Sequence, residues 1–357
     1  MKINNNAKPA GTRFMTSDTS QVHLAWIAFQ RRQESMRHIV GFDCWFYPIP
    51  KSGRLVKIVN YARLFVKSVQ ALRRAAPAIV WVQLPQVPVL WAAMLYRALS
   101  SKPIKIVADC HNAQLRKPWS HFPLTLWSLQ KADVILVHND AVLKQAESNC
   151  WPMAKVLVLE DVPAMGKDQP PTGLALKHIT APKPWVVFPA SFADDEPIAE
   201  VLAAARLAPE ITFIVTGRTP TYKLHGHKID ELPANVILPG FLPVDLFDDI
   251  LREATVVMGL TIEEGIQLSV CNEALGFGRP LVTSDTKILR RLFGDAAVLV
   301  DARNPIDIVA GCRDAVAHTA LYAGKSRALS IARTAKWQSE QLNAVDCLVH
   351  GPGAIGD

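Results

Sequence analysis

Hydrophobic residues along this chain form short runs that alternate with longer segments in which apolar residues recur three and four positions apart. Most of the short runs are apolar at nearly every position, as strands of a parallel sheet buried on both faces require. In the first half the runs are residues 22–29, 42–48, 78–84, 104–110, 133–138 and 155–160. In the second half they are residues 185–190, 211–217, 235–238, 254–260, 280–284 and 296–300. The pattern predicts an α/β protein in which helices connect parallel strands.

Two successive blocks of this alternation predict two doubly wound, Rossmann-like domains facing each other across a cleft. We place the first domain at residues 21–165, a linker rich in proline and glycine at 166–183, and the second domain, with a terminal helix, at 184–350. Residues 1–20 are expected to be a disordered lead-in, and residues 351–357 a disordered tail. Ligands of such sheets bind at the carboxyl ends of the strands, so functional residues are sought there.

Composition narrows the class of protein. The six cysteines show no CxxC spacing, which argues against a zinc ribbon or a disulfide scaffold and for a reducing compartment. The first twenty residues contain no apolar core of a signal peptide, so we expect a cytoplasmic protein. Pro85 and Pro88 divide the most apolar long stretch, 77–99, into a strand and a helix, which argues against a membrane span.

The formal net charge of +7 is consistent with an anionic partner. The basic residues do not form one stripe typical of nucleic-acid binding. They are densest in residues 54–77, an amphipathic helix with a basic face. Two interpretations stay open: an ordinary solvated helix, or a helix in contact with an anionic membrane surface.

The stretch "EEGIQLSVCNEALGFGRPLVTSD", residues 263–285, follows a predicted buried strand and contains a helix expected from about Gln267 to Phe277. The free amides of Ile266, Gln267 and Leu268 at such a helix start can bind a phosphate. Carboxylates of Glu264 and Glu273 on either side of a phosphate suit the hydroxyl pairs of sugars. The alternative is that the acids only favour a helix N-terminus and a surface ion pair.

The second half of this stretch resembles the signature of the family 4 glycosyltransferases, retaining enzymes of GT-B fold. More narrowly, the chain resembles a bacterial subgroup linked to polysaccharide biosynthesis. The stretches that carry this resemblance occur in the same order as in the subgroup: "WIAFQRRQESM", "VWVQLPQVP", "VADCHNAQLRKPW", "FPASFADDEPIAEVL" and "NEALGFGRPLVTSDT".

The resemblance implies a site for a nucleoside-diphosphate sugar. It implies that Glu273 binds the ribose hydroxyls and that Glu264 contacts the transferred sugar. The spacing of the two glutamates is one residue longer than in the family, which leaves open whether Glu263, Glu264 or neither faces the sugar. The amides from Gly265 to Leu268 would bind the diphosphate. Phe241 and Leu242, in a turn like the family's base-binding turn, would contact the nucleobase.

The chain departs from the family after the first strand of the second domain. Family members carry an Arg and a Lys there that neutralise the leaving diphosphate, whereas this chain has Ser191, followed by acids. Ser191 is expected to contact the donor without supplying charge. Arg218, at the end of a neighbouring strand, is the first candidate for a replacement cation, with Lys223 and Lys287 behind it. A solvated Arg218 is the alternative.

In the first domain, "ADCHN" ends a buried strand and places Asp109 or His111 at the ligand edge. A histidine at a strand end is commonly structural, but the family carries one near the transferred sugar and the β-phosphate. The resemblance therefore makes His111 a catalytic candidate that orients and stabilises rather than acting as a base. Arg31, Arg32 and Glu34 could grip an anionic acceptor, although a basic helix start explains them equally well.

The resulting prediction is a metal-independent hexosyltransferase that moves a sugar from a nucleoside-diphosphate sugar to a polysaccharide or lipid-linked acceptor, with retention of configuration. No P-loop motif or aspartate cluster is present for phosphoryl transfer. No cofactor, metal or nucleic-acid partner is expected, and peripheral contact with the inner membrane stays open. Two alternatives remain: a nucleotide-sugar epimerase of GT-B fold, and a non-catalytic nucleotide-sugar-binding partner protein.

Overall fold

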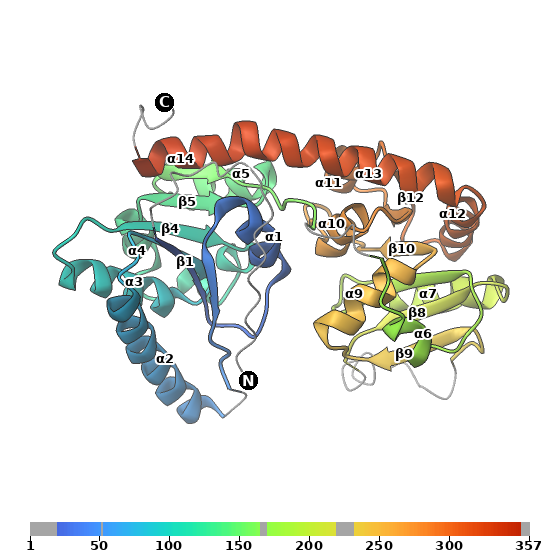
Figure 1. Ribbon diagram of the computed structural model, residues 1–357, viewed down its shortest axis with the longest axis horizontal. Helices are drawn as coiled ribbons and strands as arrows, with labels where there is room; N and C mark the ends of the chain where they lie inside the picture. The colour runs from blue at the N-terminus through green and yellow to red at the C-terminus, as the bar shows by residue number, and fades with distance from the viewer. Residues whose placement is uncertain (1–19, 51–52, 165–169, 219–231, 351–357) are drawn as a thin grey trace. The chain divides into compact units, whose positions relative to one another are not determined.

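The computed structural model describes residues 20–50, 53–164, 170–218 and 232–350 (Figure 1). The chain forms two compact units, one made of residues 1–161 and 335–357 and the other of residues 162–334. Each unit contains one six-stranded parallel sheet with helices packed on it. The predicted α/β fold with two Rossmann-like sheets is therefore confirmed.

All twelve predicted strands form. The first sheet has the order β2-β1-β3-β4-β5-β6 and contains β1 (Gln21–Ala25), β2 (Asp43–Phe46), β3 (Ile79–Leu84), β4 (Lys105–Cys110), β5 (Val134–Val137) and β6 (Val156–Val158). The second has the order β12-β11-β10-β7-β8-β9 and contains β7 (Trp185–Pro189), β8 (Thr212–Thr216), β9 (Val236–Gly240), β10 (Val256–Gly259), β11 (Leu281–Ser284) and β12 (Ala297–Val300). Both orders reverse direction beside the first strand, as in doubly wound sheets.

The helices of unit 1 cover the first sheet. α3 (Val87–Leu99) packs on β3 and β4, and α2 (Arg54–Ala75) lies alongside α3, as the blue helices of Figure 1 show. The other helical elements are α1 (Arg31–Val40), α4 (Thr125–Lys131), α5 (Asp140–Ser148) and the short 3₁₀ turns η1 (Asn112–Leu115), η2 (Trp119–His121) and η3 (Met153–Lys155).

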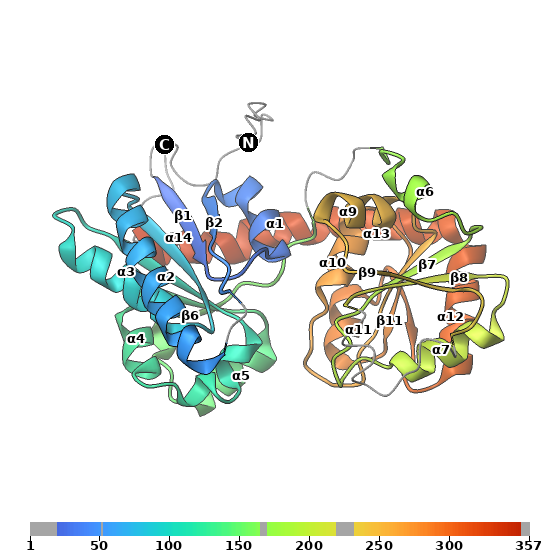
Figure 2. The same ribbon diagram turned by 90° about the horizontal axis from the view of Figure 1, so that it is seen from below.

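Helices cover both faces of the second sheet (Figure 2), and a hydrophobic layer lies between the sheet and each set of helices. One layer lies under α7 (Ile198–Leu207) and α12 (Pro305–Ala317). The opposite layer lies under α6 (Leu174–His178), α9 (Val244–Glu253), α10 (Ser269–Gly276) and α11 (Lys287–Phe293). Because both faces are covered, the strands can be apolar at nearly every position.

The C-terminal helical segment belongs to both units. It runs through α13 (Thr319–Lys336), a π-helical turn (Trp337–Leu342) and α14 (Asn343–His350). Trp337 Nε1 donates to the carbonyl of Glu160 at 2.8 Å, and the Glu160 N–H donates to Gln341 Oε1 at 2.8 Å. These bonds, with the packing of α14 on β5, attach residues 335–350 to unit 1.

This division differs from the predicted one, in which residues 184–350 carried the terminal helix and residues 162–165 belonged to the first domain. The cause is a set of contacts between residues about 180 positions apart, which no local pattern reveals. The predicted linker is also partly ordered, because α6 lies within it. The predicted lead-in and tail lie outside the described residues, apart from Ser20.

Candidate active site

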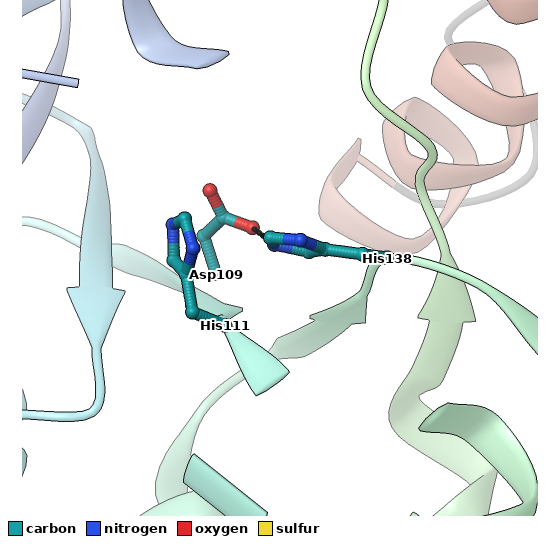
Figure 3. A group of neighbouring side chains, drawn as sticks. All are labelled: Asp109, His111 and His138. Atoms are coloured by element: carbon teal, nitrogen blue, oxygen red, sulfur yellow. Dashed lines mark ion pairs between the residues drawn. The ribbon is translucent and has the colours of Figure 1, made fainter. Parts of the chain in front are cut away.

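Two adjacent strands of unit 1 end in histidines that meet. His111 follows β4 and begins the turn η1, while His138 follows β5. Their ring centroids lie 4.4 Å apart with the planes nearly perpendicular. Asp109, inside the end of β4, points between them (Figure 3). The structure thus brings the predicted His111 together with His138, which the sequence analysis did not single out.

A buried charge network holds Asp109 in place. Arg32, on α1, is only 4% exposed, and its Nε lies 3.1 Å from Asp109 Oδ2. Its Nη2 donates to Asp109 Oδ1 at 3.2 Å and its Nη1 to Asp161. Gln33 Nε2 also donates to Asp109, at 3.1 Å. Since Asp109 is fully buried, these donors supply the pairing that a buried carboxylate requires.

The pKa values follow from this packing. Burial alone would raise the pKa of Asp109, but Arg32, together with His138 and His23, holds it well below its usual range. Burial, and then the neighbouring His138, lowers the pKa of His111 to about 3. Burial likewise lowers the pKa of His23, whose Nε2 lies 3.6 Å from Asp109 Oδ2. At neutral pH the network therefore contains neutral His111 and His23 beside charged Asp109 and Arg32.

The Asp109, His111 and His138 ligand atoms lie within 4.8 Å of one another, a spacing that a metal ion could bridge. Two imidazoles and a carboxylate are also donors that Zn²⁺ accepts. However, both oxygens of Asp109 already accept hydrogen bonds from Arg32, whose positive charge would oppose a cation at the same carboxylate. The geometry favours the ion pair, and metal independence stays a prediction.

The predicted acceptor residues separate on the same helix. Arg32 is buried and donates its hydrogen bonds to Asp109 and Asp161, so it is not available to bind an acceptor as we expected. Arg31 is partly exposed and lies over the Phe29 ring at 5.3 Å. Glu34 pairs with Arg37 at 3.2 Å on the helix surface. The hypothesis of an acceptor contact therefore rests on Arg31 and Glu34 alone.

In unit 2 the predicted phosphate loop lies between β10 and α10. The helix starts at Ser269, two residues later than predicted, because Leu268 has an extended backbone with φ −91° and ψ 121°. Gly265 has φ +78°, a conformation that favours glycine. The side-chain amide of partly buried Gln267 has no hydrogen-bond partner among the described residues. Ile266 is also partly buried in this loop.

The two glutamates of the motif lie in different environments. Glu264 is exposed, and its Oε2 accepts a hydrogen bond at 3.1 Å from the N–H of Lys287, the first residue of α11. Glu273 is only 6% exposed on α10. The structure therefore leaves the carboxylate of Glu264 near solvent and draws that of Glu273 into the unit.

Ser191, after β7, is engaged by an acid of its own loop. Its N–H and its hydroxyl both donate to Glu196, at 2.9 and 3.0 Å, and the N–H of Ala193 donates to the same carboxylate at 3.2 Å. A donor phosphate would have to displace Glu196 to use these groups. The neighbouring loop after β10 is tied to this one, because Thr261 Oγ1 donates to Asp195 at 2.8 Å.

Arg218 and Phe241, predicted for different roles, come together. Arg218 follows β8, and its Cζ lies 5.1 Å from the centroid of the Phe241 ring, which follows β9 and is 72% exposed. Leu242, by contrast, is buried. Lys287 is exposed on α11, and Lys223 lies outside the described residues. The structure therefore brings together an exposed cation and an exposed aromatic ring at this end of the sheet.

Four members of the unit 1 network escaped the sequence analysis: His23, Gln33, His138 and Asp161. His23 lies in the middle of β1, where it looked like a core position. Asp161 follows β6 and lies 129 positions from its partner Arg32. Only His138 left a usable signal, since it ends the strand next to the one that precedes His111.

The family profile described as "Glycosyl transferases group 1" matches residues 183–318, within unit 2. No curated protein matches the chain. The sucrose-phosphate synthase of Thermosynechococcus elongatus is similar in structure, with a TM-score of 0.67 at 12% identity over 91% of this chain and 98% of that one.

Two other solved structures are similar over most of their length. Anabaena HepE in complex with UDP and glucose has a TM-score of 0.63 at 14% identity, over 91% of both chains. A glycosyltransferase from Rickettsia africae has a TM-score of 0.62 at 10% identity, over 94% of this chain and all of that one. The fold is GT-B, and with the family match it supports a glycosyltransferase of GT-B type.

Proposed function

We propose that this protein transfers a hexose from a nucleoside-diphosphate sugar to a polysaccharide or lipid-linked saccharide acceptor, with retention of configuration. The match of the glycosyltransferase profile to residues 183–318 carries the proposal, because that segment contains the whole predicted donor site except its histidine. Anabaena HepE has been solved with UDP-glucose, so uridine-diphosphate sugars are the first donors to test.

Each half supplies a different part of the proposed reaction. In unit 2, Glu273 holds the ribose, the amides from Gly265 to Leu268 hold the diphosphate, and the backbone near Phe241 holds the base. Glu264 positions the transferred sugar. In unit 1, neutral His111 donates a hydrogen bond to the sugar or the β-phosphate, which its low pKa permits at neutral pH without a change of charge.

The proposed transfer breaks the bond between the anomeric carbon and the β-phosphate oxygen. The acceptor hydroxyl forms the new bond on the same face, and its proton passes to the leaving phosphate oxygen. No protein base is needed for this step. Arg218 offsets the growing negative charge in place of the family's missing cations, and no metal is required. Arg218→Ala should therefore lower turnover more than donor affinity.

The proposed working place is the cytoplasmic side of the inner membrane, with peripheral contact. Within the described residues, no helix combines the length and the apolar character needed to cross a bilayer. The exposed arginines and lysines of α2 suit an anionic lipid surface, so binding to anionic vesicles should fall steeply with salt.

One observation favours the second candidate, a non-catalytic nucleotide-sugar binder. Glu196 places a carboxylate on the amides of Ser191 and Ala193, where family members carry cations for the leaving diphosphate. A negative charge at that place would slow a reaction that builds up negative charge nearby. Donor binding without transfer or hydrolysis of any donor would support this candidate.

The test combines binding with turnover. A thermal-shift panel of UDP, GDP, ADP and CMP with their sugars identifies the donor, since a true ligand at a hundredfold excess over its Kd stabilises by about 2.7 kcal/mol. Purified protein is then incubated with that donor and lipid or saccharide acceptors. Product formed only with an acceptor supports a transferase, whereas an altered sugar without any acceptor supports an epimerase. Full activity after treatment with a chelator is expected.

A further inference from the structure

A cavity of about 440 Å³ opens on unit 1, away from the buried network. Its walls come from the first turns of α2, the start of α3 and the turn η2. Its apolar and aromatic lining consists of Ile58, Tyr61, Pro88, Pro118, Trp119 and Phe122. Lys57 is the single charged residue in the lining. The volume is in the range of small-molecule sites in proteins, about 300–1,000 Å³.

The chemistry of the walls selects the kind of ligand. Phe122 is braced by two tryptophan rings, with its centroid 5.6 Å from that of Trp119 and 5.9 Å from that of Trp91. Apart from Lys57, the lining offers only the Tyr61 hydroxyl and the Trp119 indole N–H as polar side-chain groups. A sugar would leave most of its hydroxyls without partners here, which is costly, whereas a hydrocarbon chain needs none.

The surface near the cavity is also apolar. Ile58 is 67% exposed, although it lines the cavity. Val56 and Val59, on the same turns of α2, are more than half exposed. Beyond η2, Leu124 is also more than half exposed, and Trp127 is 46% exposed. Exposed apolar residues gathered in one region mark an interaction site rather than an ordinary surface.

Charge around the cavity points to a phosphate at one end of that hydrocarbon. Lys57 lies in the lining, and the exposed Lys117 directly precedes the lining residue Pro118. Further along α2, Arg63 is exposed as well. A fully neutral lipid would not use these cations, whereas a lipid phosphate would pair with them.

The cavity is linked by the chain to the candidate active site. The wall residues Pro118, Trp119 and Phe122 lie in the segment of residues 112–122, which begins directly after His111. A lipid chain held against Trp119 and Phe122 would therefore be fixed by the same short segment that leaves the end of β4.

We infer that this cavity holds the hydrocarbon chain of a lipid acceptor that bears a phosphate head group. The inference rests on the proposed function in naming the acceptor. One lipid molecule lies in the cavity in this proposal, which differs from adsorption of α2 on a bilayer. The binding itself can be measured without any transfer reaction, so the two ideas can fail separately.

The probes are octyl, decyl and dodecyl phosphate below the concentrations at which they form micelles, with binding to the full chain measured by titration calorimetry. Each added methylene should tighten binding by up to about fourfold while the cavity fills. Ile58→Glu places a carboxylate in the lining and should weaken decyl phosphate binding by at least about tenfold. Lys57→Met, which keeps the apolar stem of the side chain and removes its charge, should weaken decyl phosphate by up to about fivefold and leave decanol unchanged.

The matched control is Val66→Glu, the same kind of change on the same helix at a residue that is 52% exposed and outside the lining. Decyl phosphate should bind this variant as it binds the wild type. Equal loss in both glutamate variants would overturn the inference in favour of adsorption along α2, as would binding to anionic vesicles alone. Affinity independent of chain length would overturn it too. Chain-length-dependent binding without sugar transfer would refute only the proposed function.

Discussion

The strand ends of the two units differ in how deeply their charged groups are buried. In unit 1, buried Arg32 pairs with buried Asp109 and part-buried Asp161, while Nε2 of His111 and of His138 has no hydrogen-bond partner among the described residues. In unit 2, Glu264, Arg218 and Phe241 are exposed, and the amide of Gln267 has no partner among the described residues. The charged groups of unit 1 are therefore held by ion pairs inside the unit, whereas those of unit 2 face solvent.

The largest effect should come from breaking the network of unit 1. Arg32→Met leaves two buried carboxylates without their cation and should lower the free energy of unfolding by about 3–5 kcal/mol. Chemical denaturation measures this loss. Arg31→Met, one residue away on the helix surface, is the control and should cost less than about 1 kcal/mol. Similar small losses in both variants would show that unit 1 does not depend on the network.

His111→Ala should remove a hydrogen-bond donor to developing charge and lower kcat by about 10²–10³-fold, or about 2.7–4 kcal/mol. Because this hydrogen bond acts on charge that develops during the reaction, donor affinity should change less than turnover. His121→Ala, an exposed histidine at the end of η2, should keep wild-type turnover. Undiminished turnover in His111→Ala would return His111 to a structural role beside His138.

Glu273→Ala should weaken nucleotide binding by about 1.5–3 kcal/mol, since a charged hydrogen-bonding partner of the ribose is lost. Titration with the nucleotide measures the change, and Glu273→Gln, which keeps the size of the buried side chain, separates lost charge from poor folding. Glu253→Ala at the end of α9 is the control. Wild-type affinity in folded Glu273→Ala and Glu273→Gln proteins would remove this residue from the donor site.

The pH dependence of the free energy of unfolding should show the lowered pKa of His111. The folded pKa of His111 is about 3, below its value in the unfolded chain, so the unfolded state binds more protons on acidification. Stability must then fall as the pH drops below about 6.5. Between pH 7.5 and 5.0, wild type should lose up to about 2 kcal/mol more than His111→Ala in urea unfolding. Equal losses would mean that His111 is protonated in the folded protein.

The smallest effect should come from removing the negative charge of Glu196 in unit 2. Glu196→Gln removes a negative charge from the amides of Ser191 and Ala193 and should improve the affinity for a nucleoside diphosphate by about 0.5–1 kcal/mol. Glu210→Gln, beside Arg313 and before β8, makes the same change at the opposite edge of the sheet. If only Glu210→Gln improved affinity, Glu196 would not be opposing the diphosphate.

The fold was largely predictable because its strands are buried on both faces. Runs such as "AIVWVQL" and "DVILVH" contain too few polar residues to be anything but core, and each became a strand. Boundaries were less certain where backbone geometry decides: α10 starts at Ser269 because Leu268 is extended. Hydrophobicity does not encode that turn.

The site was predictable only in part. The sequence placed His111 at a strand end, and the structure adds His138 beside it. The sequence did not distinguish Arg31 from Arg32, because neighbouring polar residues at the start of a helix give no indication of which one points toward the sheet. The partner that decides, Asp161, lies 129 positions away. Long-range pairing of charges of this kind leaves no local pattern.

The attachment of the C-terminal segment to unit 1 determines where chimeras between proteins of this fold should be joined. Because residues 335–350 complete unit 1, unit 2 is in effect an insertion into unit 1 rather than its successor. A chimera that exchanges everything after residue 161 would replace the helix that covers β5 and would lose the Trp337 contact with Glu160. Exchanging residues 162–334 alone keeps both, so unit 2 should be exchanged as an internal segment.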